Sequence, residues 1–170
     1  MGKLGTILFC AAMAHGAEWG QTANGLRMSL AVDSQVSYFT LTFENIEERR
    51  EMFLWLGTAG LAEADRVKMF LLMPDGTRAP LLFTGGNGVA PGRLIPMIAP
   101  LLGGSTYSLR IPINRLYRTN HTPIDGVLLR QGAFQAEIAQ PPDVDMRFVD
   151  CFGLRIFWHG NAASNALRIR

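Results

Sequence analysis

The sequence has little charge, few cysteines and no long apolar run. Charged residues make up 18% of its 170 residues, below the roughly 25% usual in soluble domains, whereas hydrophobic residues reach 48%. A disordered chain needs the opposite balance, so that class is excluded. The 16 basic residues barely exceed the 14 acidic ones, which argues against a nucleic-acid-binding protein that must neutralise many phosphates.

No apolar stretch is as long as the ~20 residues that a transmembrane helix needs. The chain begins MGKLGTILFCAAMAHGA, in which Lys3 precedes the apolar stretch Leu4–Ala14 and small residues follow. A short positive start, an apolar centre and a small-residue exit predict a secretory signal peptide over residues 1–17. The alternative is a buried first strand or helix of the mature fold. We therefore expect a secreted or periplasmic protein with one domain over residues 18–170.

The chain has two cysteines, Cys10 and Cys151. Signal cleavage removes Cys10 and leaves Cys151 alone, so no disulfide can close within the mature chain. Cys151 lies in an apolar segment and is expected to be a buried thiol that packs as a small hydrophobe. Cys10 also permits a lipoprotein alternative, although Phe9 stands where a small residue is usual.

Apolar and polar residues alternate along several short runs, which is the period of half-buried strands. Such runs at short intervals, without a long helical period, predict an all-β fold, an antiparallel β-sandwich or barrel. Residues 46–56 allow either a helical turn or a strand, and the neighbouring strands favour the strand. The alternating apolar residues are Leu26, Met28, Leu30 and Val32; Phe39, Leu41 and Phe43; Val67, Met69, Leu71 and Met73; Tyr107, Leu109, Ile111 and Ile113; Phe134, Ala136 and Ile138; and Leu154, Ile156 and Trp158, followed after a Gly-Asn break by Leu167 and Ile169.

Turn residues separate these runs. Pro74-Asp75-Gly76-Thr77 predicts a hairpin, because Gly76 can adopt the positive φ of a tight turn. Pro112 lacks a backbone donor, so its strand should lie at a sheet edge or carry a bulge. Pro141-Pro142-Asp143 is expected to interrupt the chain before a last hairpin.

Several short motifs stand out along the chain: Trp19-Gly20 with Gly25-Leu26-Arg27, Leu41-Thr42-Phe43-Glu44-Asn45, Leu54-Trp55-Leu56-Gly57, Asp75-Gly76 and the segment Trp158–Leu167. Together they resemble small exported bacterial proteins with an immunoglobulin-like β-sandwich, a largely uncharacterised group. The resemblance spans most of residues 18–170 and implies fold geometry rather than activity. Some relatives in architecture resemble bacterial proteinase inhibitors, but no inhibitory loop can be matched here residue by residue.

The Trp158–Leu167 segment has a structural interpretation. Trp158 is suited to closing one end of the core, Gly160 permits a sharp turn beneath it, and Ser164 or Asn165 can bond to nearby backbone. An exposed Trp158 would instead favour carbohydrate or peptide binding.

Catalytic and metal-binding patterns find little support. The three histidines, His15, His121 and His159, show no zinc-ligand spacing, and Ser105 has no nucleophile elbow. The acidic residues near the C-terminus, Asp143, Asp145 and Asp150, lack the glycine and closing glutamate of a calcium loop. We therefore expect no catalytic, cofactor-binding or metal-binding residues.

Three further features have plain interpretations. Gly85-Gly86-Asn87-Gly88 lacks the lysine and helix of a phosphate-binding loop. Arg110, Arg115, Arg118 and Arg130, with Tyr107 and Tyr117 interleaved, could form a modest anion-binding patch. Asn120-His121-Thr122 is a glycosylation sequon only in a eukaryotic secretory pathway.

The first functional hypothesis is an exported, cofactor-free binding or accessory module for a protein or glycan partner. Its recognition loops would be Gly85–Arg93 and Thr119–Gly126, because loops on a rigid sandwich vary without disturbing the core. A protease inhibitor is one alternative. A secreted hydrolase with dispersed Ser, His and Asp residues is another, and it would require His121 or His159 to bond to an acid and a nucleophile.

Overall fold

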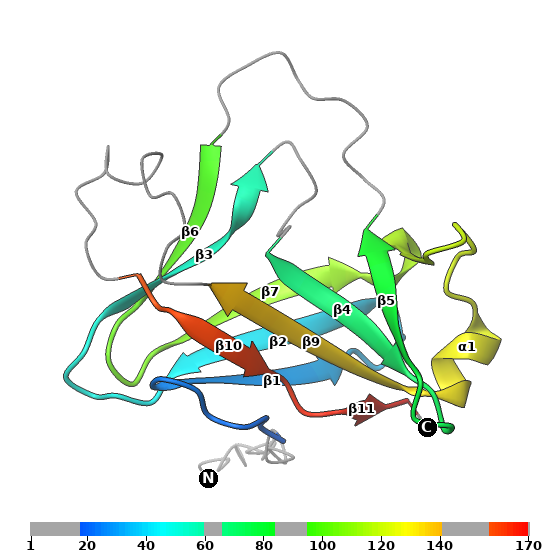
Figure 1. Ribbon diagram of the computed structural model, residues 1–170, viewed down its shortest axis with the longest axis horizontal. Helices are drawn as coiled ribbons and strands as arrows, with labels where there is room; N and C mark the ends of the chain where they lie inside the picture. The colour runs from blue at the N-terminus through cyan, green and yellow to red at the C-terminus, as the bar shows by residue number, and fades with distance from the viewer. Residues whose placement is uncertain (1–17, 60–65, 84–94, 141–156, 170) are drawn as a thin grey trace, which may run out of the picture.

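A computed structural model describes residues 18–59, 66–83, 95–140 and 157–169 (Figure 1). In these ranges the helices are short: the 3₁₀ turn η1 (Ile113–Arg115) and α1 (Gly126–Gln131). Every strand pair is antiparallel. The predicted all-β antiparallel class is confirmed, and the immunoglobulin-like assignment stays a prediction.

The smaller of the two main sheets has three strands in the order β1 (Leu26–Val32), β2 (Tyr38–Asn45) and β7 (Thr106–Pro112). Alternation places Phe39, Leu41 and Phe43 of β2 inward, and all three are fully buried. Among the described strands β7 pairs only with β2, so Pro112 lies at a sheet edge as predicted.

The larger sheet follows the order β10 (Gly160–Ala163), β9 (Ala133–Gln140), β4 (Val67–Leu72), β5 (Arg78–Phe83) and β8 (Leu116–Arg118). A further strand, β11 (Leu167–Arg168), also pairs with β9.

The predicted hairpin between β4 and β5 is confirmed. The amide of Met73 donates to the carbonyl of Thr77 over 2.8 Å, and Gly76 has a φ of +85°. A left-handed conformation of this kind is the reason that glycine is favoured at the position.

A separate two-stranded ribbon joins β3 (Met52–Ala59) to β6 (Ile95–Leu101). Its register shifts between Trp55 and Gly57, which marks a bulge. The strand interpretation of residues 46–56 is therefore confirmed from Met52 onward.

The core lies between the two main sheets, which face one another in Figure 1. The rings of Phe39 on β2 and Phe134 on β9 have centroids 4.9 Å apart. Buried residues from both sheets and from β3 and β6 join them in one cluster. The two sheets and this shared core are the frame on which the loops are held.

The end of the described chain differs from the expected hairpin. Gly160 and Asn161 do not break a strand, because both belong to β10. In addition, β10 and β11 each pair with β9 rather than with one another, so they act as one interrupted strand along it. Leu154, Ile156 and Pro141-Pro142-Asp143 lie outside the described residues.

No helix in the described ranges is both long enough and apolar enough to cross a membrane. Residues 1–17, the predicted signal peptide, lie outside these ranges.

Candidate functional site

The structure describes one of the two loops selected from the sequence. Thr119–Gly126 connects β8 to α1, whereas Gly85–Arg93 lies outside the described residues. Cys151 and the acidic residues Asp143, Asp145 and Asp150 also fall outside them.

The Thr119–Gly126 loop folds back along β8 in a tight hairpin. The amide of Arg118 donates to the carbonyl of Thr122 over 2.9 Å, and the amide of His121 donates to the carbonyl of Arg118 over 2.8 Å. The side-chain oxygen of Asn120 accepts from the amide of Thr122 over 3.1 Å. His121 has a φ of +61°, an uncommon left-handed conformation for a residue with a Cβ, and these local bonds hold it there.

The helix that follows is short but firmly attached. A side-chain oxygen of Asp125 accepts hydrogen bonds from the amides of Val127 (3.0 Å) and Leu128 (2.8 Å), which caps α1. Ile124 just before it is buried, with 8% of its surface exposed. At the other end, a Cβ on Gly132 would lie 2.7 Å from the backbone carbonyl oxygen of Leu72, so only glycine allows this close approach to β4.

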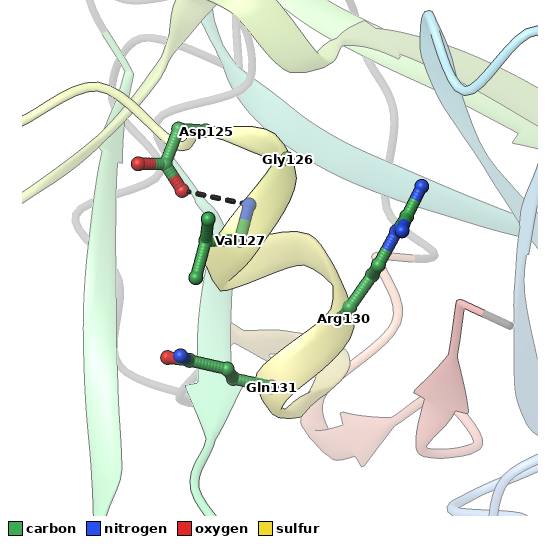
Figure 2. A pocket seen from close by; sticks show the side chains of 5 residues that line it. All are labelled: Asp125, Gly126, Val127, Arg130 and Gln131. Atoms are coloured by element: carbon green, nitrogen blue, oxygen red, sulfur yellow. Dashed lines mark hydrogen bonds between the residues drawn. The ribbon is translucent and has the colours of Figure 1, made fainter.

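An open pocket lies against α1, with a volume of about 550 Å³. Figure 2 shows the side chains of Val127 and Gln131 projecting to one side of the helix and that of Arg130 to the other. Val127 is 61% exposed, a large fraction for an aliphatic side chain. The remaining lining residues are Asp125 and Gly126. We call Val127, Arg130 and Gln131 the α1 surface.

The side chains of the α1 surface offer hydrogen-bonding groups. Arg130 offers a planar set of donors, and Gln131 offers a donor and an acceptor. One oxygen of the Asp125 carboxylate, Oδ1, accepts both bonds of the helix cap. The lining contains no hydroxyl, thiol or imidazole group that would serve as a nucleophile or a general base.

The two described histidines occupy different parts of the fold. His121 is exposed in the loop after β8, and His159 directly precedes β10. The Nδ1 atom of His159 is buried without a hydrogen-bond partner. Within the ranges that the structure covers, no group of three or more His, Cys, Asp or Glu side chains could hold a metal ion.

Trp158 is part of the core, as the structural interpretation predicted. Only 2% of its surface is exposed, and its indole nitrogen donates to the carbonyl of Ala23 over 3.2 Å. Gly160 lies beneath the ring with a φ of +149°, and a Cβ there would come within 2.9 Å of it. Carbohydrate or peptide binding at Trp158 would require an exposed ring, and this ring is buried.

Ser164 and Asn165 join strands from both main sheets, and we call this pair the clamp. The hydroxyl of Ser164 accepts from the amide of Ala136 on β9 over 3.0 Å and donates to the carbonyl of Asn165 over 2.8 Å. The side chain of Asn165 accepts from the amide of Leu30 on β1 over 2.6 Å and donates to its carbonyl over 3.1 Å. The prediction of bonds to nearby backbone is thus correct for one contact only, because the others reach residues distant in sequence.

The four arginines named from the sequence belong to four different elements. Arg110 is on β7, Arg115 in η1, Arg118 on β8 and Arg130 on α1. Arg110 stacks on the ring of Tyr38, with 4.2 Å between the guanidinium carbon and the ring centroid. That partner was missed because it is far away in the sequence and only the pairing of β2 with β7 brings it close.

The α1 surface was also missed, since the selected loop ended at Gly126. A local signal for it is present. Asp125 is a preferred helix N-cap residue, and Val127, Leu128 and Leu129 follow it before Arg130.

Comparison with family models, curated proteins and solved structures found no match for this chain.

Proposed function

We propose that the chain is an exported, non-catalytic module that binds a partner protein through the α1 surface. The observation that carries the proposal is an exposed aliphatic side chain, Val127, at an open pocket, with the amide of Gln131 on the same side of the helix and the guanidinium of Arg130 on the other (Figure 2). Apolar centres with polar groups around them are typical of protein interfaces.

The shape of the pocket supports a protein partner over a small ligand. Small-molecule sites usually enclose most of the ligand surface, whereas this pocket is open along the helix. An open hollow can receive a side chain that projects from another protein, with Arg130 and Gln131 available for hydrogen bonds.

Firm attachment of α1 also supports recognition. The Asp125 cap, buried Ile124 and the close approach at Gly132 hold the helix before any partner arrives. A surface that is ordered in advance loses less conformational entropy on binding.

Export is supported by the order of residues 1–17, in which one lysine precedes an apolar stretch and small residues. N-terminal sequencing of the protein recovered from its native source tests this part. A new terminus at His15 or Glu18, after Ala14 or Ala17, is expected on a protein outside the cytoplasm, and a cytosolic species that begins at Met1 or Gly2 contradicts export.

Binding is tested by affinity capture from the native extracellular fraction with three proteins: the unchanged chain, Val127→Asp and Leu102→Asp. Leu102 is 58% exposed and belongs to the turn between β6 and β7, so it provides a matched control. A partner that binds the unchanged chain and Leu102→Asp, but binds Val127→Asp at least about tenfold more weakly, supports the proposal. Equal retention by all three proteins contradicts it.

A further inference from the structure

The outward face of the β1-β2-β7 sheet presents an ordered grid of polar side chains. Residues that pair directly across antiparallel strands lie on the same side of the sheet. Because Phe39, Leu41 and Phe43 point into the core, the alternate residues of β2 and their partners point outward. Three rows result: Arg27, Glu44 and Thr106; Ser29, Thr42 and Ser108; Ala31, Thr40 and Arg110. Ser29 is buried, with 5% of its surface exposed, so the accessible hydroxyls of the middle row are those of Thr42 and Ser108.

Hydroxyl groups fill the middle of this face. Thr42 and Ser108 bond through their side-chain oxygens over 3.0 Å, and Thr40 and Thr106 lie in the adjoining rows. Each hydroxyl is both a donor and an acceptor. The face therefore matches a ligand whose own groups donate and accept equally, as sugar hydroxyls do.

Two arginine–aromatic stacks flank the hydroxyls. At one end, the guanidinium carbon of Arg27 lies 4.3 Å from the ring centroid of Trp19, and its Nε bonds to Glu44 over 2.6 Å. At the other end, Arg110 stacks on Tyr38. Along β2, the span from Glu44 to Tyr38 is about 20 Å at ~3.4 Å per residue. This length suits an extended polymer better than a single small molecule.

The stacks also fix the polar groups in place. A guanidinium held flat against a ring has fewer conformations to lose when it binds. Arg27 is restrained on two sides, by Trp19 and by Glu44. The donors at both ends of the grid are thus positioned before any ligand arrives.

The charges on this face nearly cancel. Arg27 and Arg110 are opposed by Glu44 and by Asp33, which follows β1 and accepts from the amides of Ser37 (2.6 Å) and Tyr38 (3.0 Å). A polyanion such as a nucleic acid would require a clear excess of positive charge. Charge balance instead matches an uncharged polymer.

A protein partner is a poorer match for this face than for the α1 surface. Protein interfaces depend on large apolar or aromatic anchors in contact with the partner. The exposed large hydrophobic residues of the described chain are Ile46, Leu82, Leu102 and Val127, and none belongs to the grid.

From these observations we propose that the outward face of β1-β2-β7 binds a neutral polysaccharide. Sugar hydroxyls would bond to the Thr42–Ser108 row and to Arg110, and the hydrocarbon side of a sugar ring would contact the exposed parts of Trp19 and Tyr38. The α1 surface takes no part in this binding, so the two proposals stand or fall separately.

Affinity electrophoresis of the full chain tests the proposal, in native gels that contain hydroxyethylcellulose, xylan, dextran or starch. Alginate serves as the acidic probe. Two variants provide a matched pair: Ala31→Glu on the grid and Ala139→Glu on the outward face of β9. Both alanines are exposed on strands, so the two variants carry the same change of charge on opposite sheets. Mobility is compared for each protein with and without polysaccharide.

The expected result is retardation by at least one neutral polysaccharide, with affinity reduced at least about tenfold by Ala31→Glu and less than about twofold by Ala139→Glu. Ser108→Glu, a second exposed position on the grid, should repeat the loss, and urea unfolding verifies that each variant folds. Three outcomes overturn the proposal: no retardation by any neutral probe, retardation by alginate alone, or equal losses in Ala31→Glu and Ala139→Glu.

Discussion

The Trp158–Asn165 and Thr119–Gln131 segments both place polar side chains in tight turns, but their hydrogen bonds reach different distances along the chain. In the first segment, Trp158 and Asn165 bond to Ala23 and Leu30, each 135 positions away. In the second, Asn120 and Asp125 bond to amides two or three positions away. Long-range bonds join the strands of a buried core, whereas local bonds shape an exposed loop without tying its outer side chains. The first segment therefore serves stability, and the second leaves residues available for recognition.

The largest expected effect comes from the buried ring. Trp158→Ala should lower the free energy of unfolding by about 3–5 kcal/mol, because it removes a core side chain and leaves a cavity. Val127→Ala, on the α1 surface, should change it by less than about 0.5 kcal/mol. Urea denaturation of both variants measures the difference. Similar losses of unfolding free energy in the two variants would contradict the assignment of a stabilising role to the Trp158–Asn165 segment alone.

Two asparagines give a closer comparison. Asn165→Ala leaves the amide and carbonyl of Leu30 without their side-chain partners, at an expected cost of about 2 kcal/mol. Asn120→Ala removes one bond in an exposed turn, where water replaces it, and should cost less than about 0.5 kcal/mol. Thermal and urea unfolding of both variants measure the two losses of unfolding free energy. A cost for Asn120→Ala equal to that for Asn165→Ala would contradict it.

The helix cap should have a smaller and more local effect. Asp125→Ala is expected to cost about 1 kcal/mol, since the amides of Val127 and Leu128 lose their acceptor. Asp125→Asn keeps an acceptor oxygen and should retain most of the stability. Hydrogen exchange should show faster exchange at these two amides in Asp125→Ala, with the strands unchanged. Faster exchange throughout β9 would show that α1 supports the core rather than the loop.

A second carboxylate makes the same kind of local bond in the β4–β5 turn. The amide of Thr77 donates to Asp75, and this bond holds the pKa of the Asp75 carboxyl below its ordinary value of 3.8. A lowered folded-state pKa contributes stability that is fully present above 3.8 and is lost as the pH falls through the folded-state value. Urea midpoints measured from about pH 5 down to about pH 2 should therefore fall less steeply for Asp75→Asn than for the unchanged chain. Identical slopes would rule out this contribution.

Much of the fold was predictable because alternation and turn residues act locally. Phe39, Leu41 and Phe43 point inward as a period of two requires, and Gly76 has the positive φ that its turn demands. The end of the chain was harder, since Gly160 and Asn161 have the composition of a break but pair with β9 in a strand. Tertiary pairing there overrides local preference.

The candidate sites were less predictable for the same reason. The Thr119–Gly126 loop was selected from its sequence, but the exposed residue at its pocket, Val127, lies one position beyond it. The face proposed to bind a polysaccharide depends on three strands, and Ser29, Thr42 and Ser108 become neighbours only through the register of β1, β2 and β7. No local pattern contains that register.

The clamp has a consequence for how the chain reaches its native state. Asn165 lies 135 positions after Leu30 in the sequence. Until Asn165 is synthesised and folds back, the amide and carbonyl of Leu30 in β1 lack their side-chain partners. A newly synthesised chain must therefore keep an incomplete strand edge from pairing with other molecules while most of its length is still being made. Contacts between residues so far apart in sequence also slow folding, which lengthens the time before Asn165 reaches Leu30. Under the proposed export, such a delay would leave the chain unfolded for its passage across a membrane.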